Sequence, residues 1–266
     1  MDFLVIPLLS ALVAAVTLVS GFGLGTVLMP AFAIFFPIEI AVAATAVVHF
    51  ANNLFKLALV GKLADRAVVL RFGLPAAAAA LLGAALMLTL AEAPAIAAYR
   101  LGPVHASITW LKLTIAVLLA TLAALELHPA YHRLSFSRRA LPVGGLLSGF
   151  FGGISGMQGA LRAPFLLRAG LTKEAFVGTA NVISAIVDAV RIAVYAAGLA
   201  WMARSPDYAV LTSPRTLALI AAACIAGFLG SFLGARFLRK ITLAAVRTTV
   251  AVLLFLVAAA LAAGIL

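Results

Sequence analysis

Long apolar runs fill most of the chain and are separated by short polar stretches. Six uninterrupted runs predict membrane helices, at 38–60, 73–91, 106–126, 175–199, 216–235 and 243–264. Two further runs, 4–36 and 141–169, are interrupted by glycines and then by a proline. A straight helix over the first of them would be about 50 Å long, whereas the hydrocarbon core of a bilayer is about 30 Å thick. Each interrupted run is therefore predicted to form two short helices that meet at the glycines.

The two halves of the chain share one pattern, in which a glycine-broken segment is followed by three apolar helices. A shift of 134 residues superimposes Pro30 on Pro164, Gly25 on Gly159 and Thr45 on Thr179. Three coincidences in one register, at the same place in a four-element pattern, indicate duplication. We therefore expect an N-terminal repeat over 1–140 and a C-terminal repeat over 141–266, which together form one transmembrane domain.

Composition places the chain outside the range of soluble proteins. It is 65% hydrophobic and 10% charged, and its mean hydropathy is +1.22, as expected for an all-α polytopic protein in a lipid bilayer. The net charge of +11 has no soluble basic patch to occupy, so no nucleic-acid partner is expected. The start Met1-Asp2-Phe3 lacks a basic segment, which argues against a cleaved signal peptide. The single cysteine, Cys224, allows no internal disulfide.

The distribution of Lys and Arg between the loops predicts the orientation in the membrane. If each broken segment crossed once, the 15 loop cations of the 19 in the chain would divide 8 to 7 between the two sides. If each broken segment enters and returns, they divide 12 to 3, which satisfies the positive-inside rule. The second arrangement makes the repeats inverted, leaves both termini outside the cytoplasm and places the linker 127–140 inside it. Re-entrant hairpins and pairs of short spans remain open alternatives.

Two polar stripes and the glycine turns supply the candidate chemistry. His49, Asn52, Asn53 and Lys56 fall at i, i+3, i+4 and i+7, which is one face of a helix. A second stripe consists of Asn181, Ser184, Asp188 and Arg191. A cation at a membrane helix centre costs roughly 2.5–3.5 kcal/mol, so such residues normally face the bundle interior with a partner or a function.

Buried cations beside helix breaks favour an anion, because free backbone N–H groups and helix N-termini are also positive. Arg162, between the second glycine turn and Pro164, offers a fixed fork of donors for an oxyanion. The predicted substrate-binding residues are Arg162, Lys56, Arg191, Asn52, Asn53, Asn181, Gln158, Gly23, Gly25, Gly156, Gly159, Thr45 and Thr179. Asp188 or His49 would carry a coupling proton, with sodium as the alternative coupling ion. No catalytic residue, cofactor or metal site is predicted, since His128 and His132 lack a third ligand.

Several of these residues have simpler explanations. Asp188 and Arg191 stand at i, i+3 and would neutralise each other. Arg162 would shield the turn at the cytoplasmic mouth, Lys112 would extend to the membrane interface, and His49 would be a hydrogen-bonded core residue. The glycines would serve only to bring helices close together.

The chain resembles the sulfite exporter TauE/SafE family of membrane permeases, also called TSUP, over essentially its whole length. The matching stretches are Gly21-Phe-Gly-Leu-Gly-Thr-Val-Leu-Met-Pro30, Gly152-Gly-Ile-Ser-Gly-Met-Gln-Gly159, Phe176-Val-Gly-Thr179 and Gly230-Ser-Phe-Leu-Gly-Ala-Arg236. The resemblance implies transport of a small anion such as sulfite, sulfoacetate or another sulfonate across a bacterial inner membrane. Leu24, Gln158 and Ala160 depart from the family pattern and leave the particular substrate open.

The leading hypothesis is a secondary transporter, not an enzyme, that works by alternating access around an anion site at the paired glycine turns. The alternative from another class is an integral-membrane enzyme acting on a lipid or thiol substrate, which would need a nucleophile with a base or a metal cluster. A membrane scaffold is a third reading, in which buried charge would have no use. The direction of transport and a homodimeric assembly stay open.

Overall fold

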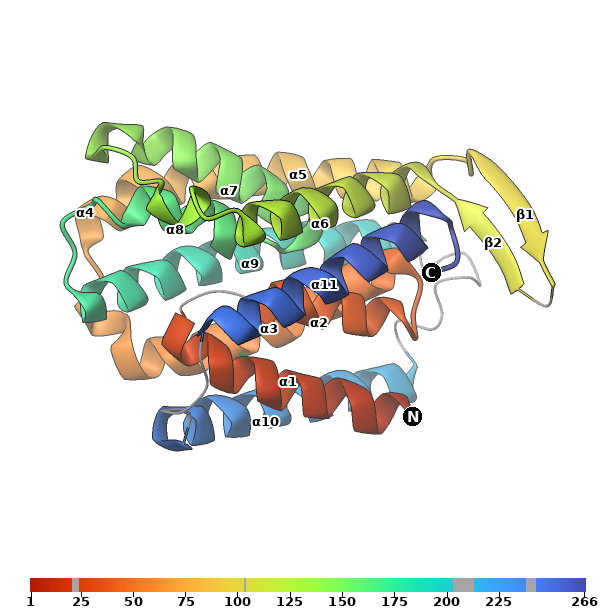
Figure 1. The fold of residues 1–266 in the computed structure, drawn as a ribbon, viewed down its shortest axis with the longest axis horizontal. Helices are drawn as coiled ribbons and strands as arrows, with labels where there is room; N and C mark the ends of the chain where they lie inside the picture. The colour runs from red at the N-terminus through yellow and green to blue at the C-terminus, as the bar shows by residue number, and fades with distance from the viewer. Residues whose placement is uncertain (21–23, 103, 203–212, 238–242) are drawn as a thin grey trace.

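Eleven helices and one β-hairpin are present in the computed structural model, which describes residues 1–20, 24–102, 104–202, 213–237 and 243–266 (Figure 1). The helices are α1 Asp2–Ser20, α2 Leu24–Ala33, α3 Ile38–Val60, α4 Arg66–Val68, α5 Leu74–Glu92, α6 Trp110–Leu127, α7 Leu141–Ser155, α8 Gly159–Leu166, α9 Lys173–Met202, α10 Pro214–Phe237 and α11 Leu243–Ala262. The strands are β1 Ala97–Leu101 and β2 Val104–Ile108. A π-helical turn, Val69–Gly73, joins α4 to α5 without interrupting the helical run.

Several of these helices can span a bilayer. Within the described ranges, five are long and apolar enough: Ile38–Ala58, Arg66–Glu92, Trp110–Leu127, Lys173–Gly198 and Pro214–Leu233. Asp2–Ala15 and Val250–Ala262 are shorter apolar helices. Large apolar side chains such as Leu82, Val117 and Leu256 are exposed on the outside, where lipid rather than water solvates them. The predicted all-α polytopic class is confirmed.

One predicted boundary is wrong. The helix expected from 106 begins at Trp110, because Val104–Ile108 pairs antiparallel with Ala97–Leu101. Gly102, with φ +58°, provides the left-handed residue that this short turn needs. Thr109 then caps α6 by accepting a hydrogen bond from the Lys112 backbone N–H at 3.2 Å. The hairpin follows Glu92 at the end of the bundle where both termini also lie (Figure 1).

The second broken segment enters the bundle and returns. α7 ends at Gly156, whose φ of +80° is a left-handed conformation that reverses the chain. α8 then runs back beside α7, since the Ser148 hydroxyl donates to the Gln158 carbonyl at 2.9 Å. Farther along, the Phe136 N–H donates to the Pro164 carbonyl at 3.1 Å, close to where α7 began. In the first half α1 packs against α2, and residues 21–23 between them lie outside the described part.

Other glycines of α7 serve close packing rather than the turn. A Cβ on Gly149 would stand 2.1 Å from the Ala76 carbonyl oxygen of α5, and one on Gly153 would stand 2.4 Å from the Ala80 carbonyl oxygen. Backbone-to-backbone contact of this kind requires glycine. The packing explanation is therefore correct for these positions, whereas Gly156 makes the break.

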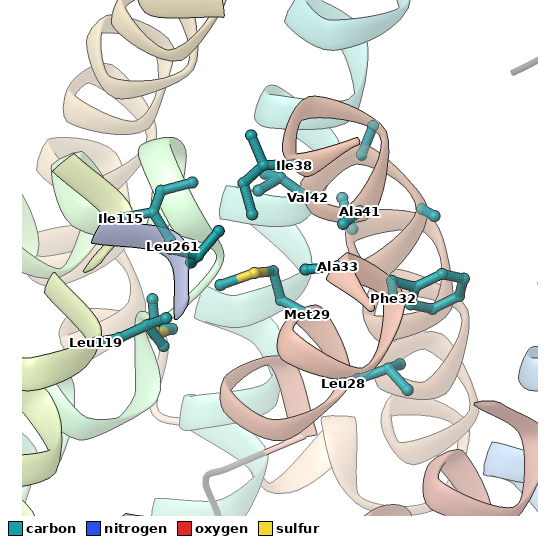
Figure 2. Packing of buried hydrophobic residues seen from close by; sticks show 14 of the residues in the cluster. Leu28, Met29, Phe32, Ala33, Ile38, Ala41, Val42, Ile115, Leu119 and Leu261 are labelled. Atoms are coloured by element: carbon teal, nitrogen blue, oxygen red, sulfur yellow. The ribbon is translucent and has the colours of Figure 1, made fainter. Parts of the chain in front are cut away.

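The main apolar core holds the short arm α2 in place. Figure 2 shows Met29 of α2 pointing toward Leu261 of α11, with Ile115 and Leu119 of α6 close by. Ile38 and Val42 of α3 belong to the same buried cluster. Because lipid tails are as apolar as these side chains, van der Waals packing rather than removal from water stabilises them here. α2 contacts α1, α3 and α11 although it has only 10 residues.

The linker closes the opposite end of the bundle. Tyr131 donates a hydrogen bond to the Ala160 carbonyl of α8 at 2.6 Å. Burial, with the Glu126 carboxylate adding to it, raises the pKa of Tyr131 to about 12, so the hydroxyl keeps its proton. Arg138 pairs with Asp65 at 3.6 Å, which joins the linker to the loop between α3 and α4.

Exposed cations gather at this linker end. They are Lys62, Arg66, Arg71, Arg133, Arg138, Arg139, Arg168 and Lys173. At the end with the termini and the hairpin, the exposed cations among the described side chains are Arg100 and Arg215, and Arg215 pairs with Asp2 at 2.9 Å.

Candidate functional site

A buried carboxylate, Asp188, stands where α3 packs on α9. Its Oδ2 accepts from Asn53 Nδ2 at 2.8 Å and lies 2.6 Å from His49 Nδ1. Its Oδ1 accepts from Arg191 Nε at 2.9 Å and from Gln158 Nε2 at 3.2 Å. Donors from both predicted polar stripes and from the second glycine turn thus meet on one carboxylate.

Arg162 reaches the same cluster from α8. Its side chain is buried, and Nη1 donates to Ser184 Oγ at 2.7 Å and to Gln158 Oε1 at 3.4 Å. The Gln158 amide therefore bridges the guanidinium of Arg162 and the carboxylate of Asp188. This inward position is incompatible with Arg162 shielding the mouth of the bundle.

Arg191 lies against the helix break. A Cβ on Gly156 would stand 2.4 Å from Arg191 Nη1, so the guanidinium occupies space that only a glycine leaves free. Arg191 is 0% exposed, and its Nη2 pairs with Asp188 Oδ1 at 2.8 Å. Neither Nη1 nor Nη2 makes a hydrogen bond of good geometry among the described residues, although the Tyr195 hydroxyl lies close enough to interact with the guanidinium. A buried donor is thus directed at the junction of α7 and α8.

The junction itself is positive. α8 begins at Gly159 without a side-chain cap from Gln158. The first N–H groups of a helix have no partner within the helix and carry the positive end of its dipole. Together with Arg191 and Arg162, they form a cluster of donors suited to an oxyanion.

The stripe on α3 faces two neighbours. His49 and Asn53 contact α9, whereas Asn52 accepts from Ser231 Oγ of α10 at 2.8 Å. Within the described part of the chain, Asn52 Nδ2 and Thr45 Oγ1 are buried and have no hydrogen-bond partner. Lys56, one turn beyond Asn52 on this helix, is also buried.

Other predicted residues lie apart from Asp188. Thr179 accepts from the Asp65 backbone N–H at 2.9 Å, nine residues before Asp188 and so about 13 Å away along the helix axis. Asn181 is buried on the same helix, two turns from Asp188. Gly23 lies outside the described residues, and for Gly25 only its place in the first turn of α2 is described.

Lys112 and His128 serve local structure. Lys112 donates from Nζ to the Ser107 carbonyl at 2.8 Å and to its hydroxyl at 3.1 Å, at the hairpin end of α6. It is therefore not part of the central cluster. His128 accepts from the Ala130 N–H in the linker turn at 3.2 Å. Across the described residues, no three His, Cys, Asp or Glu side chains are grouped to hold a metal ion.

Sequence reasoning missed two hydroxyl contacts that hold the site together. Tyr195 of α9 donates to the Gly153 carbonyl of α7, and Ser231 donates to Asn52. Tyr195 stands four residues after Arg191 and so continues the polar stripe of α9. That spacing was a usable signal, and Ser231 lies within the stretch 230–236 that resembles the family.

The fold and the cluster define a class, a multi-pass helical membrane protein with a hydrogen-bonded charge cluster at its centre. The sequence model described as sulfite exporter TauE/SafE matches residues 6–261. The chain therefore belongs to the TauE/SafE family of membrane transporters, as its motifs predicted. Comparison with curated proteins and with solved structures gave no match.

Proposed function

We propose that the protein is a secondary permease for a small anion, such as sulfite or an organosulfonate, that binds at the α7–α8 break. The observation that carries this proposal is the charge of the buried centre, where Arg162 and Arg191 are accompanied by one carboxylate, Asp188. Burying a cation costs several kcal/mol unless an opposite charge offsets it. A bound anion would provide that offset.

The geometry favours an oxyanion between Arg191 and the start of α8. Arg191 Nη1 offers a donor beside Gly156, and α8, which has no side-chain cap, begins three residues later at Gly159. Asp188 holds Arg191 by Nε and Nη2, which leaves Nη1 for the substrate. Asn52, Asn53, Asn181, Gln158, Thr45 and Thr179 would complete or support the binding path on either side of the break.

Alternating access would move one half of the chain against the other. The helix contacts support two inverted repeats over 1–140 and 141–266, because α1 packs on α10 as α7 packs on α5. In this correspondence α3 is equivalent to α9 and α6 is equivalent to α11. The structure has α3 in contact with α9 and α6 in contact with α11, so each helix packs on its equivalent in the other repeat. The central charge cluster lies on the α3–α9 contact, where such a movement would open and close it.

The exposed cations support an orientation with the linker 127–140 in the cytoplasm of a bacterium and both termini on the other side of the inner membrane. The linker end carries eight of the described exposed cations and the other end two, as the positive-inside rule requires. A proton or sodium ion would drive transport, with His49 or Asp188 as the proton carrier. A homodimer is compatible with this arrangement.

The test is counterflow of radiolabelled sulfite and sulfoacetate in proteoliposomes, preceded by a thermal-shift screen with these anions, taurine, thiosulfate, sulfate and small carboxylates. A ligand of the native state stabilises it by mass action. We expect Arg162→Gln to abolish counterflow with nearly unchanged folded yield. Lys112→Gln is the matched control, since it removes a partly buried cation away from the cluster and should keep counterflow. Absence of stabilisation and counterflow with every anion would refute the proposal.

A further inference from the structure

We infer that His49 carries one coupling proton on its Nε2 atom, and that this proton and the anion cross the membrane in the same direction. The inference rests on the proposed function, and it selects between the two carrier candidates and between cotransport and exchange. It follows from how the bonds of Asp188 are distributed and from the sign of the charge around His49.

Asp188 is poorly placed to take up a proton. Each of its oxygens already accepts two hydrogen bonds, Oδ1 from Arg191 and Gln158, and Oδ2 from Asn53 and His49. A carboxylate offers about four acceptor positions, so a proton on Asp188 would displace one of these donors. The side chain is also 0% exposed.

His49 can take up a proton without losing a bond. Because Asp188 only accepts, Nδ1 of His49 must hold its hydrogen, which leaves Nε2 as the basic nitrogen of the neutral ring. Protonation at Nε2 keeps the 2.6 Å contact and turns it into an ion pair. The side chain is 12% exposed, so it is less enclosed than that of Asp188.

The surrounding charges determine the sign of the coupling. The charged groups connected to the cluster are Asp188 and Arg191 of α9 and Arg162 of α8, while Lys56 lies two turns beyond His49 on α3. Ser231 of α10 is uncharged, and α2 contains no titratable residue. Two cations and one carboxylate give the cluster a formal charge of +1 with neutral His49 and +2 with protonated His49.

An anion binds better to the more positive cluster, and by linkage it raises the proton affinity of His49 by the same factor. Proton and anion therefore load together and leave together. Exchange of an anion for a proton would require the opposite sign of coupling.

The experiment distinguishes anion accumulation driven by a pH gradient from exchange of labelled for unlabelled anion at uniform pH. Proteoliposomes with an alkaline interior and an acidic exterior should accumulate labelled sulfite or sulfoacetate, whichever shows counterflow, and a protonophore should abolish the accumulation. His49→Asn places an amide donor where Nδ1 stood but cannot take up a proton. We expect this variant to lose accumulation driven by the gradient by a much larger factor than it loses counterflow at uniform pH. His128→Asn, in the linker, should keep both.

A measurement on the unmodified protein covers the case in which His49→Asn does not fold. In weakly buffered detergent solution with a pH indicator, anion binding should take up protons, by up to one per site. Proton release, no proton change on binding, or gradient-driven accumulation by a folded His49→Asn variant would overturn the inference. Loss of counterflow in the unmodified protein would instead refute the proposed function.

Discussion

Gly156→Ala tests the arrangement at the helix break. Gly156 has φ +80°, and an added Cβ would meet Arg191 Nη1 at 2.4 Å and Cζ at 3.1 Å. The left-handed conformation costs about 1–2 kcal/mol for a residue with a Cβ. Pushing the guanidinium away from Asp188 costs up to about 3–5 kcal/mol, the typical cost of breaking a buried pair.

Gly170→Ala is the matched control. Gly170 also has a left-handed φ, +72°, but nothing lies within 4 Å of an added Cβ. It should therefore incur only the backbone cost of about 1–2 kcal/mol. The difference in free energy of unfolding between the two variants isolates the contact with Arg191. A loss of only about 1.4 kcal/mol in the free energy of anion binding would weaken binding about tenfold.

The assay is thermal unfolding of both variants in detergent, with and without the stabilising anion. Gly156→Ala should unfold at a clearly lower temperature than Gly170→Ala and should lose most of the stabilisation by the anion, whereas Gly170→Ala should keep it. Equal losses of stability in the two variants, with anion affinity retained in both, would show that Arg191 does not rest against the break.

Three further changes probe the packing around the site. Gly149→Ala should lower the folded yield severely, because its Cβ would stand 2.1 Å from a backbone oxygen of Ala76 that cannot move aside, and folded yield by size-exclusion chromatography measures this. Tyr131→Phe should lower stability by about 1–3 kcal/mol by leaving the buried Ala160 carbonyl unpaired. The pKa of Tyr131 is raised to about 12 in the folded state, so its contribution to stability is complete below the unfolded-state pKa of about 10 and is lost as pH rises through 12. Unfolding curves of wild type and Tyr131→Phe should therefore differ by the same amount across neutral pH. A difference that varied in this range would contradict the assignment. Ser231→Ala should reduce counterflow more than stability, because it frees a polar atom beside the site; an unchanged transport rate would assign Ser231 to packing alone.

The apolar runs and the glycine turns in the sequence were enough to predict the helices and the break between α7 and α8. Helix formation depends on side chains within one or two turns, so the run 175–199 fell inside α9, and Gly156 fell inside the predicted glycine turn. The same local rule placed His49 and Asn53 on one helix face, where the structure has them. The hairpin before Trp110 was missed because two short strands stabilise each other only as a pair.

Which side chains meet was decided by tertiary structure. His49 and Asp188 are 139 positions apart, and only the packing of α3 on α9 brings them to 2.6 Å. The sequence offered both Thr179 and Arg191 as substrate-binding candidates. In the structure Thr179 accepts a hydrogen bond from the Asp65 backbone N–H, whereas Arg191 lies against Gly156. The periodicity of a helix determines which face a residue occupies, while the partner of that face depends on how whole helices pack, because burial and hydrogen bonding across the bundle involve residues distant in the chain.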